Sequence, residues 1–351
     1  MERMPMASLI CALVLISIAN SSAQLAPAND SCAAAVRPPQ PAACSDGTPH
    51  KRTCVTVADG VQLQVLDWGG ADKPDTMVLL TGFGDNAHVY DSFAYQFTDY
   101  FHVIGITRRG FLPSSQPKQG YEVATRVQDD IEVLKHLGIS KAVFVGHSLA
   151  GSELSALGLN YKSYVEKLVY LDAYDLSKRF DRPEIPPVPF KDSDGRSVQI
   201  WHAAVMRLDN NVEPPPAFCS GLFFDAKGAI TGGSTPDWVR PQIFASIMKN
   251  PEVNWADIDA PRLGIFAQPS VEGKVAFYWY LSPAEKKTFD ANWPGIVDWY
   301  ARTTERFAQA NAGKPTPVVY LLPDAPHYFY LSNQAFVVRQ MREFLLGNLG
   351  N

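Results

Sequence analysis

The sequence predicts an α/β protein built on a doubly wound, mostly parallel sheet with an inserted cap. Three observations lead to this expectation. Short apolar runs alternate with segments of helical periodicity over residues 55–172 and again over 261–351, a pattern typical of parallel sheets covered by helices. A proline-rich stretch, residues 173–260, interrupts the alternation and is predicted to be the cap. One apolar run leads into a serine flanked by glycines, as expected of a sharp strand-to-helix turn.

The expected strands are short runs of apolar residues. The first two surround the turn Asp59-Gly60 and indicate a hairpin, and the others are continuous enough to be buried parallel strands. In chain order they are residues 55–57, 63–68, 77–80, 102–106, 141–145, 167–171, 262–267 and 317–322.

The expected helices show apolar residues three or four positions apart. They cover residues 126–137, 149–159 and 287–310, and the first ends before Gly138, as helices often do. The last helix is predicted to begin near Ser332, whose side chain is a good N-cap.

Residues 1–23 have the composition of a signal peptide. Arg3 precedes an apolar stretch, residues 7–19, and Ser21-Ser22-Ala23 supplies the small residues that signal peptidase prefers. We therefore expect cleavage near Ala23 and export to the periplasm or the medium. The apolar stretch is short for a lasting span, so no stable membrane span is expected after processing; an uncleaved anchor is the alternative.

The cysteines agree with export. Cys11 falls within the signal segment, and the even number that remains suggests two disulfides of open connectivity. Residues 24–54 are rich in Pro, Ala and Ser and are predicted to form an irregular arm that disulfides hold in place. The remaining cysteines are Cys32, Cys44, Cys54 and Cys219.

Composition excludes several classes of function. The 351 residues are 46% hydrophobic, enough for a full core. The net charge is −5 and no basic run is long enough to suggest a nucleic-acid surface. No cysteine pair has the spacing of a zinc site, and we expect neither a metal nor another cofactor. The oligomeric state is left open.

The turn Gly146-His147-Ser148-Leu149-Ala150-Gly151 fits the pattern G-x-S-x-G. Strand and helix approach so closely there that a Cβ at the glycines would clash. The pattern therefore predicts a serine with an exposed Oγ at a helix N-terminus, where backbone N–H groups stabilise a developing oxyanion. An ordinary tight turn with an inert serine is the alternative.

A nucleophilic serine needs a base and an oxyanion hole. His327 follows the last expected strand, and parallel sheets gather reactive groups at the carboxyl ends of their strands. His147 is expected to point away from the reactive face of Ser148. The N–H of Leu149 is one predicted oxyanion donor, and the N–H of Phe83, in a glycine-rich loop after an early strand, is the other.

These segments resemble an α/β-hydrolase of the lipase and esterase type with a cap. Residues 81–84 correspond to its H-G-x-G loop, 107–114 to its D-x-R-G-x-G-x-S segment, and 325–327 to its histidine loop, beside the serine turn. The resemblance covers residues 55–348 and implies the α/β-hydrolase fold.

The resemblance implies two positions for the acid that orients the histidine. One follows the strand 262–267, where Glu272 is the candidate, and the other ends the strand 167–171, where Asp172 stands. We favour Asp172 and keep Glu272 as the alternative. The acid would hold His327 in the required tautomer.

The resulting hypothesis is a serine hydrolase that cleaves carboxylic esters through an acyl-enzyme on Ser148, with His327 as general base. Epoxide hydrolases and haloalkane dehalogenases of this fold carry an aspartate at the turn, so the serine argues against their chemistry. The cap and the aromatic residues 277–280 suggest a small to medium apolar ester. Hydrolysis of amides, lactones or carbon–carbon bonds, and a non-catalytic binding protein on this fold, are the alternatives.

Overall fold

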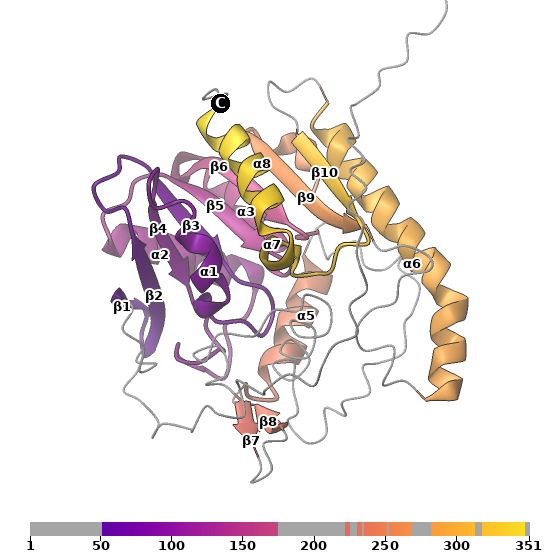
Figure 1. The fold of residues 1–351 in the computed structure, drawn as a ribbon. Coiled ribbons are helices and arrows are strands. Elements are labelled where there is room, and N and C mark those ends of the chain that lie inside the picture. Colours follow the sequence, from indigo (N-terminus) through magenta and orange to yellow (C-terminus); the bar gives the residue numbers. More distant parts are fainter. Residues whose placement is uncertain are drawn as a thin grey trace, which may run out of the picture.

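The computed structural model describes residues 51–174, 222–224, 230–233, 235–250, 253–268, 282–312 and 318–347, and an eight-stranded sheet forms its centre (Figure 1). The strand order is β1-β2-β4-β3-β5-β6-β9-β10. The strands are β1 (Lys51–Ala58), β2 (Val61–Gly69), β3 (Thr76–Leu80), β4 (His102–Ile106), β5 (Ala142–His147), β6 (Val165–Leu171), β9 (Arg262–Gln268) and β10 (Val318–Pro323).

The sheet is antiparallel at one edge and parallel elsewhere. β2 pairs antiparallel with β1 and β4, whereas every pairing from β4 to β10 is parallel. Every residue of β3 and β5 is buried, but in the edge strand β1 only Val55 is fully buried. Central parallel strands are covered on both faces and therefore consist of continuous apolar runs. The predicted α/β fold with a mostly parallel sheet is confirmed.

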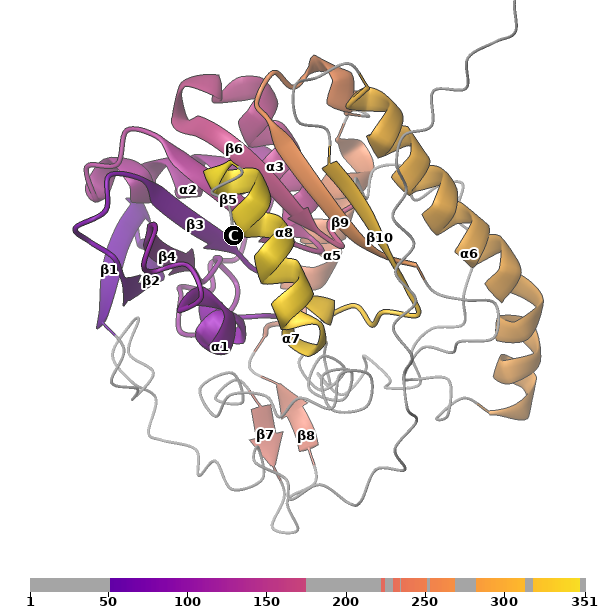
Figure 2. The ribbon, with the colours of Figure 1, turned by 45° about the horizontal axis from the view of Figure 1, so that its top comes forward.

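Helices cover both faces of this sheet (Figures 1 and 2). The side chains of β5 alternate, so that Val143 and Val145 join one apolar core while Ala142 and Phe144 join the other. The first core includes α1 (Asp91–Ala94), α7 (Phe329–Ser332) and α8 (Gln334–Leu346). The second includes α2 (Val123–His136), α3 (Ala150–Asn160), α5 (Val239–Lys249) and α6 (Pro283–Ala310). Short 3₁₀ turns occur at Ala87–Tyr90, Lys162–Tyr164 and Trp255–Asp257.

Several boundaries differ from the predictions, and α2, for example, begins at Val123 rather than at residue 126. β1 begins at Lys51, so the strand takes in the end of the predicted irregular arm 24–54. α6 begins at Pro283, because Ser282 and Glu285 form a reciprocal capping box ahead of the predicted start. Ser332 is not the N-cap of the last helix; it ends α7, and α8 begins after Asn333.

Part of the predicted cap, residues 173–260, is described. β7 (Leu222–Phe224) and β8 (Ile230–Gly233) form an antiparallel pair. This pair and α5 lie on the side of the sheet where the parallel strands end (Figures 1 and 2). Two hydrogen bonds connect α5 to the rest of the fold. Ser246 Oγ accepts from the Val123 N–H at 2.9 Å, and Nε1 of the N-cap residue Trp238 donates to Pro117 O at 2.9 Å.

The predicted signal peptide, most of the N-terminal arm, Cys32, Cys44 and Cys219 lie outside the described residues. Cys54 lies within β1. Among the helices that the structure describes, none combines the length and apolar character needed to cross a membrane.

Candidate active site

The serine turn lies between β5 and α3, at the carboxyl end of the sheet. Ser148 is half-buried and has a φ of 54°, the left-handed region that side chains other than glycine seldom adopt. A Cβ on Gly146 would lie 2.8 Å from the Ala150 Cβ, and one on Gly151 would lie 2.6 Å from the carbonyl oxygens of Ala173 and Tyr174. The glycines are therefore required by close packing, and the expected strand, turn and helix are all present.

Asp172 and His327 form a direct pair. The carboxylate Oδ2 of Asp172 lies 2.6 Å from His327 Nδ1. Asp172 follows β6, is 4% exposed, and is fixed by the backbone of β9: its N–H donates to Ile265 O at 2.8 Å, and its Oδ1 accepts from the Ala267 N–H at 3.0 Å. Both carboxylate oxygens are thus engaged, and the one facing His327 accepts the Nδ1 proton. The alternative acid, Glu272, lies outside the described residues.

The serine turn and the histidine loop are in contact. The Ser148 N–H donates to Leu171 O at 3.2 Å, so the backbone at the serine is bonded to the residue before Asp172. His147 Nε2 donates to His327 O at 3.0 Å, and the two imidazole rings pack with their centroids 4.4 Å apart. His327 therefore lies between Asp172 and the turn that carries Ser148.

His147 supports the His327 loop, a role that was not predicted from the sequence. Its fully buried ring supports the His327 loop rather than only filling space beneath the turn. Beside it, Tyr328 Oη donates to both oxygens of buried Asp85, at 3.0 and 3.2 Å. Burial and the Asp85 carboxylate raise the pKa of Tyr328 well above its usual value, so its hydroxyl remains a donor. Neither Asp85 nor Tyr328 was identified from sequence, because only the fold brings residues so distant in the chain together.

Phe83 and Leu149, the predicted oxyanion donors, come from adjacent segments. The loop carrying Phe83 follows β3, and β3 pairs with β5, which leads to Leu149. Both residues are buried, and within the described part of the chain neither backbone N–H donates to another group of the protein. The Phe83 ring packs against Phe111 and against Phe244 of α5, with centroid distances of 5.5 and 5.2 Å. Two buried N–H groups are thus available to an anionic oxygen.

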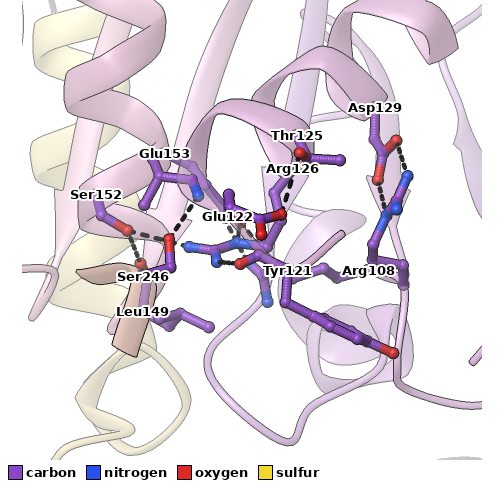
Figure 3. A network of polar contacts seen from close by, with 12 residues as sticks. Arg108, Tyr121, Glu122, Thr125, Arg126, Asp129, Leu149, Ser152, Glu153 and Ser246 are labelled. Atoms are coloured by element: carbon purple, nitrogen blue, oxygen red, sulfur yellow. Dashed lines mark hydrogen bonds and ion pairs between the residues drawn. The ribbon is translucent and has the colours of Figure 1, made fainter. Parts of the chain in front are cut away.

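Arg108, Arg126 and Glu153 form a buried ionic network (Figure 3). Arg108 Nε and Arg126 Nε each donate to Glu153 Oε1, at 2.7 and 2.6 Å, and Arg108 Nη2 also bonds Glu153 Oε2. Burial alone would raise the pKa of Glu153, but the two guanidinium groups outweigh it and lower that pKa below its usual 4.5. Glu153 is therefore ionised between two arginines. The network was not predicted from the sequence, in which Arg108 is part of the segment 107–114 that resembles the family pattern.

Replacing Glu153 by glutamine should lower the free energy of unfolding at neutral pH by about 3–5 kcal/mol, because two buried guanidinium groups lose their counter-charge. A lowered pKa in the folded state gives stability that is present above pH 4.5 and is lost as the pH falls through the folded pKa. Urea unfolding at several pH values should therefore show a smaller loss in acid for the variant than for the wild type.

The matched control is Asp298→Asn, which breaks an exposed pair with Arg302 on α6. Exposed pairs contribute at most about 1 kcal/mol. If both variants lost the same free energy of unfolding, the buried network would not stabilise the fold more than an exposed ion pair does.

A family model for the α/β hydrolase fold matches residues 75–195. This segment contains the loop after β3, Arg108, the serine turn and Asp172. The chain belongs to the α/β-hydrolase superfamily. Among the described residues of this α/β-hydrolase, no group of His, Cys, Asp and Glu is arranged to hold a metal ion.

Known proteins similar to this α/β-hydrolase have varied activities. Over 34% of its length, it is 28% identical to mouse epoxide hydrolase 3, and the match covers 33% of that protein. Again over 34% of its length, it is 31% identical to a bifunctional esterase/perhydrolase from Acinetobacter calcoaceticus, and this match covers 44% of that protein. The chain thus spans less than half the length of these curated relatives. The crystal structure of E-2-(acetamidomethylene)succinate hydrolase superposes with a TM-score of 0.59 at 18% identity, covering 85% of this chain and 100% of that one.

Proposed function

We propose that this α/β-hydrolase is a serine hydrolase that cleaves carboxylic esters. One observation carries the proposal: the 2.6 Å contact between Asp172 and His327, in a loop that packs against the Ser148 turn. A carboxylate on Nδ1 keeps the proton there and leaves Nε2 unprotonated, which is the tautomer that a general base needs. Similarity to an esterase and to other hydrolases supports the same class of reaction.

In the proposed mechanism, His327 Nε2 takes the proton of Ser148 as the serine oxygen attacks the ester carbonyl. Negative charge develops on the carbonyl oxygen, which accepts hydrogen bonds from the N–H groups of Phe83 and Leu149. His327 then returns the proton to the leaving alcohol, and the acyl group stays on Ser148. Water, activated by the same histidine, releases the acid. Asp172 stabilises the imidazolium in both halves of the cycle.

We propose a small to medium apolar ester as the substrate. The side chains of Phe83, Phe111 and Phe244 form an aromatic group beside the proposed oxyanion loop. Since Phe244 belongs to α5, within the stretch predicted as the cap, this helix would help to shape an apolar acyl or alcohol site. Amides, lactones and carbon–carbon bonds are alternatives that the same three residues could serve.

Similarity to epoxide hydrolases suggests epoxide hydrolysis as a second candidate reaction. We favour acyl transfer because Ser148 occupies the turn where epoxide hydrolases of this fold carry an aspartate. A serine has no carboxylate oxygen with which to open an epoxide.

A fluorophosphonate probe tests the proposal. The folded protein should be labelled, and mass spectrometry of its peptides should find the probe on Ser148, because only an activated serine attacks phosphorus at a useful rate. A panel of p-nitrophenyl esters of increasing chain length would then identify the preferred acyl group. Absence of labelling in the folded protein would favour a non-catalytic binding protein on the hydrolase fold.

We also propose that the protein is exported and that its cysteines outside the signal segment form disulfides. The basic, apolar and small-residue regions of residues 1–23 support export. N-terminal sequencing of the protein recovered from the periplasm or medium of a bacterial host should begin near Gln24. Recovery of only the uncleaved chain in the membrane fraction would oppose this proposal.

A further inference from the structure

The guanidinium group of Arg108 bonds two backbone carbonyls of the proposed oxyanion loop. Its Nη2 donates to Thr81 O at 3.0 Å and its Nη1 donates to Gly82 O at 3.2 Å. Arg108 is 5% exposed, so these bonds form in a site with little competing water. The guanidinium is planar and carries several donors in a fixed arrangement, and it can therefore hold two successive carbonyls in one orientation.

The bond to Gly82 O has a consequence for Phe83. The Gly82 carbonyl and the Phe83 N–H belong to the same peptide group, which is planar and trans, so the two point in opposite directions. When Arg108 fixes the carbonyl on one side of the loop, it also fixes the direction of the N–H on the other. A cation on the carbonyl oxygen further polarises the peptide and strengthens its N–H as a donor.

The other edge of Arg108 reaches the helix that follows the serine turn. Its Nε donates to Glu153 Oε1 at 2.7 Å, and Glu153 lies in the first turn of α3, whose N-cap is Leu149. Arg126 holds the same carboxylate from α2. The pair Arg108–Glu153 therefore connects the loop of one proposed oxyanion donor, Phe83, to the helix that begins at the other, Leu149.

We infer that Arg108 is a positioning residue that aims the Phe83 N–H at the oxyanion and fixes its separation from the Leu149 N–H. The inference rests on the proposed function. The neighbouring Arg109 provides a contrast, since it is equally buried and makes two bonds of 2.6 Å to Asp129, from Nε and from Nη2, but has no bond to the loop. The two arginines thus allow the loss of a buried ion pair to be separated from the loss of loop orientation.

The test compares Arg108→Met, Arg108→Lys and Arg109→Met in the purified protein. With an ester substrate, Arg108→Met should lower kcat by about 10- to 100-fold with little change in KM, somewhat less than the loss of a complete oxyanion donor. Arg108→Lys, which keeps the charge near Glu153 but cannot hold both carbonyls and the carboxylate, should show an intermediate loss. Arg109→Met should keep the wild-type kcat in its folded fraction, even where its unfolding midpoint falls.

Inhibition by an apolar trifluoromethyl ketone supplies a readout that a purely structural role would not change. The ketone forms a tetrahedral adduct whose oxyanion needs both donors, so its inhibition constant should rise in Arg108→Met by the factor by which kcat/KM falls. The pH profile should not move, because Asp172 and His327 are untouched. Wild-type kcat and ketone affinity in either folded Arg108 variant would overturn the inference.

A third measurement needs no variant. In the wild-type ketone adduct, the amide proton of Phe83 should shift strongly downfield in the NMR spectrum as it bonds the oxyanion, and an unchanged resonance would overturn the inference even if both Arg108 variants failed to fold. A wild-type protein that neither hydrolyses esters nor reacts with a fluorophosphonate would instead refute the proposed function. The two failures are therefore distinguishable.

Discussion

Replacing Ser148 by alanine is expected to lower kcat for an activated ester by about 10⁴- to 10⁶-fold, because members of a nucleophile–base pair act as a unit and the loss of one removes the covalent route. KM should change little, since the pocket and both oxyanion donors remain. Labelling by a fluorophosphonate should disappear. The measurement is the steady-state rate of p-nitrophenyl acetate hydrolysis, with circular dichroism to confirm that the variant is folded.

Ser155→Ala is the matched control for this experiment. Ser155 is a buried serine on α3, the helix that follows the Ser148 turn, and its hydroxyl lies 3.4 Å from Tyr170 Oη. We expect it to keep wild-type kcat. If Ser148→Ala also kept its activity and its labelling, the acyl-enzyme mechanism would be wrong.

Most of the sheet could be predicted because its signals are local. A buried parallel strand is apolar along its whole length, and β5 was expected at 141–145 and observed at Ala142–His147. The serine turn could be predicted for the same reason, because close packing requires Gly146 and Gly151 at a fixed spacing from Ser148. Each of these features is determined by residues within a few positions of one another.

The acid that orients His327 could not be identified from local signals in this way. Asp172 meets His327 across 155 positions of the chain, and the contact depends on β9 lying between β6 and β10. The resemblance implied either Asp172 or Glu272, and the positions of the two preceding strands in the sheet were not known from the sequence. The fold shows where the Asp172 carboxylate points; Glu272 lies outside the described residues.

Buried polar networks were missed for a related reason. Arg108, Arg126 and Glu153 come from three different segments, and none of them is marked locally as buried. Charged residues are usually exposed, so a sequence pattern assigns them to the surface. Their pairing is a property of the tertiary structure, and so is the contact between His147 and the His327 loop.

Replacing Asp172 by asparagine should lower kcat by about 10⁴-fold, the effect expected when the catalytic histidine is held in the wrong tautomer. The structure supplies a specific reason. Oδ1 of Asp172 accepts from the Ala267 N–H at 3.0 Å, while Oδ2 faces His327 Nδ1. An asparagine would keep its oxygen toward Ala267, so its NH₂ group would face the histidine. Nδ1 would then have to accept, and the proton would move to Nε2, where the base must be free.

Asp324→Asn is the matched control, because Asp324 lies in the His327 loop, is exposed, and shares with Asp172 a positive φ, 53° against 46°. Asparagine tolerates this conformation, so neither substitution should disturb the backbone. We expect wild-type kcat in Asp324→Asn and nearly wild-type kcat in Glu272→Gln. A large loss in Glu272→Gln together with an active Asp172→Asn would transfer the role of the acid to Glu272. In that case the Asp172–His327 contact would serve only to hold the loop in place.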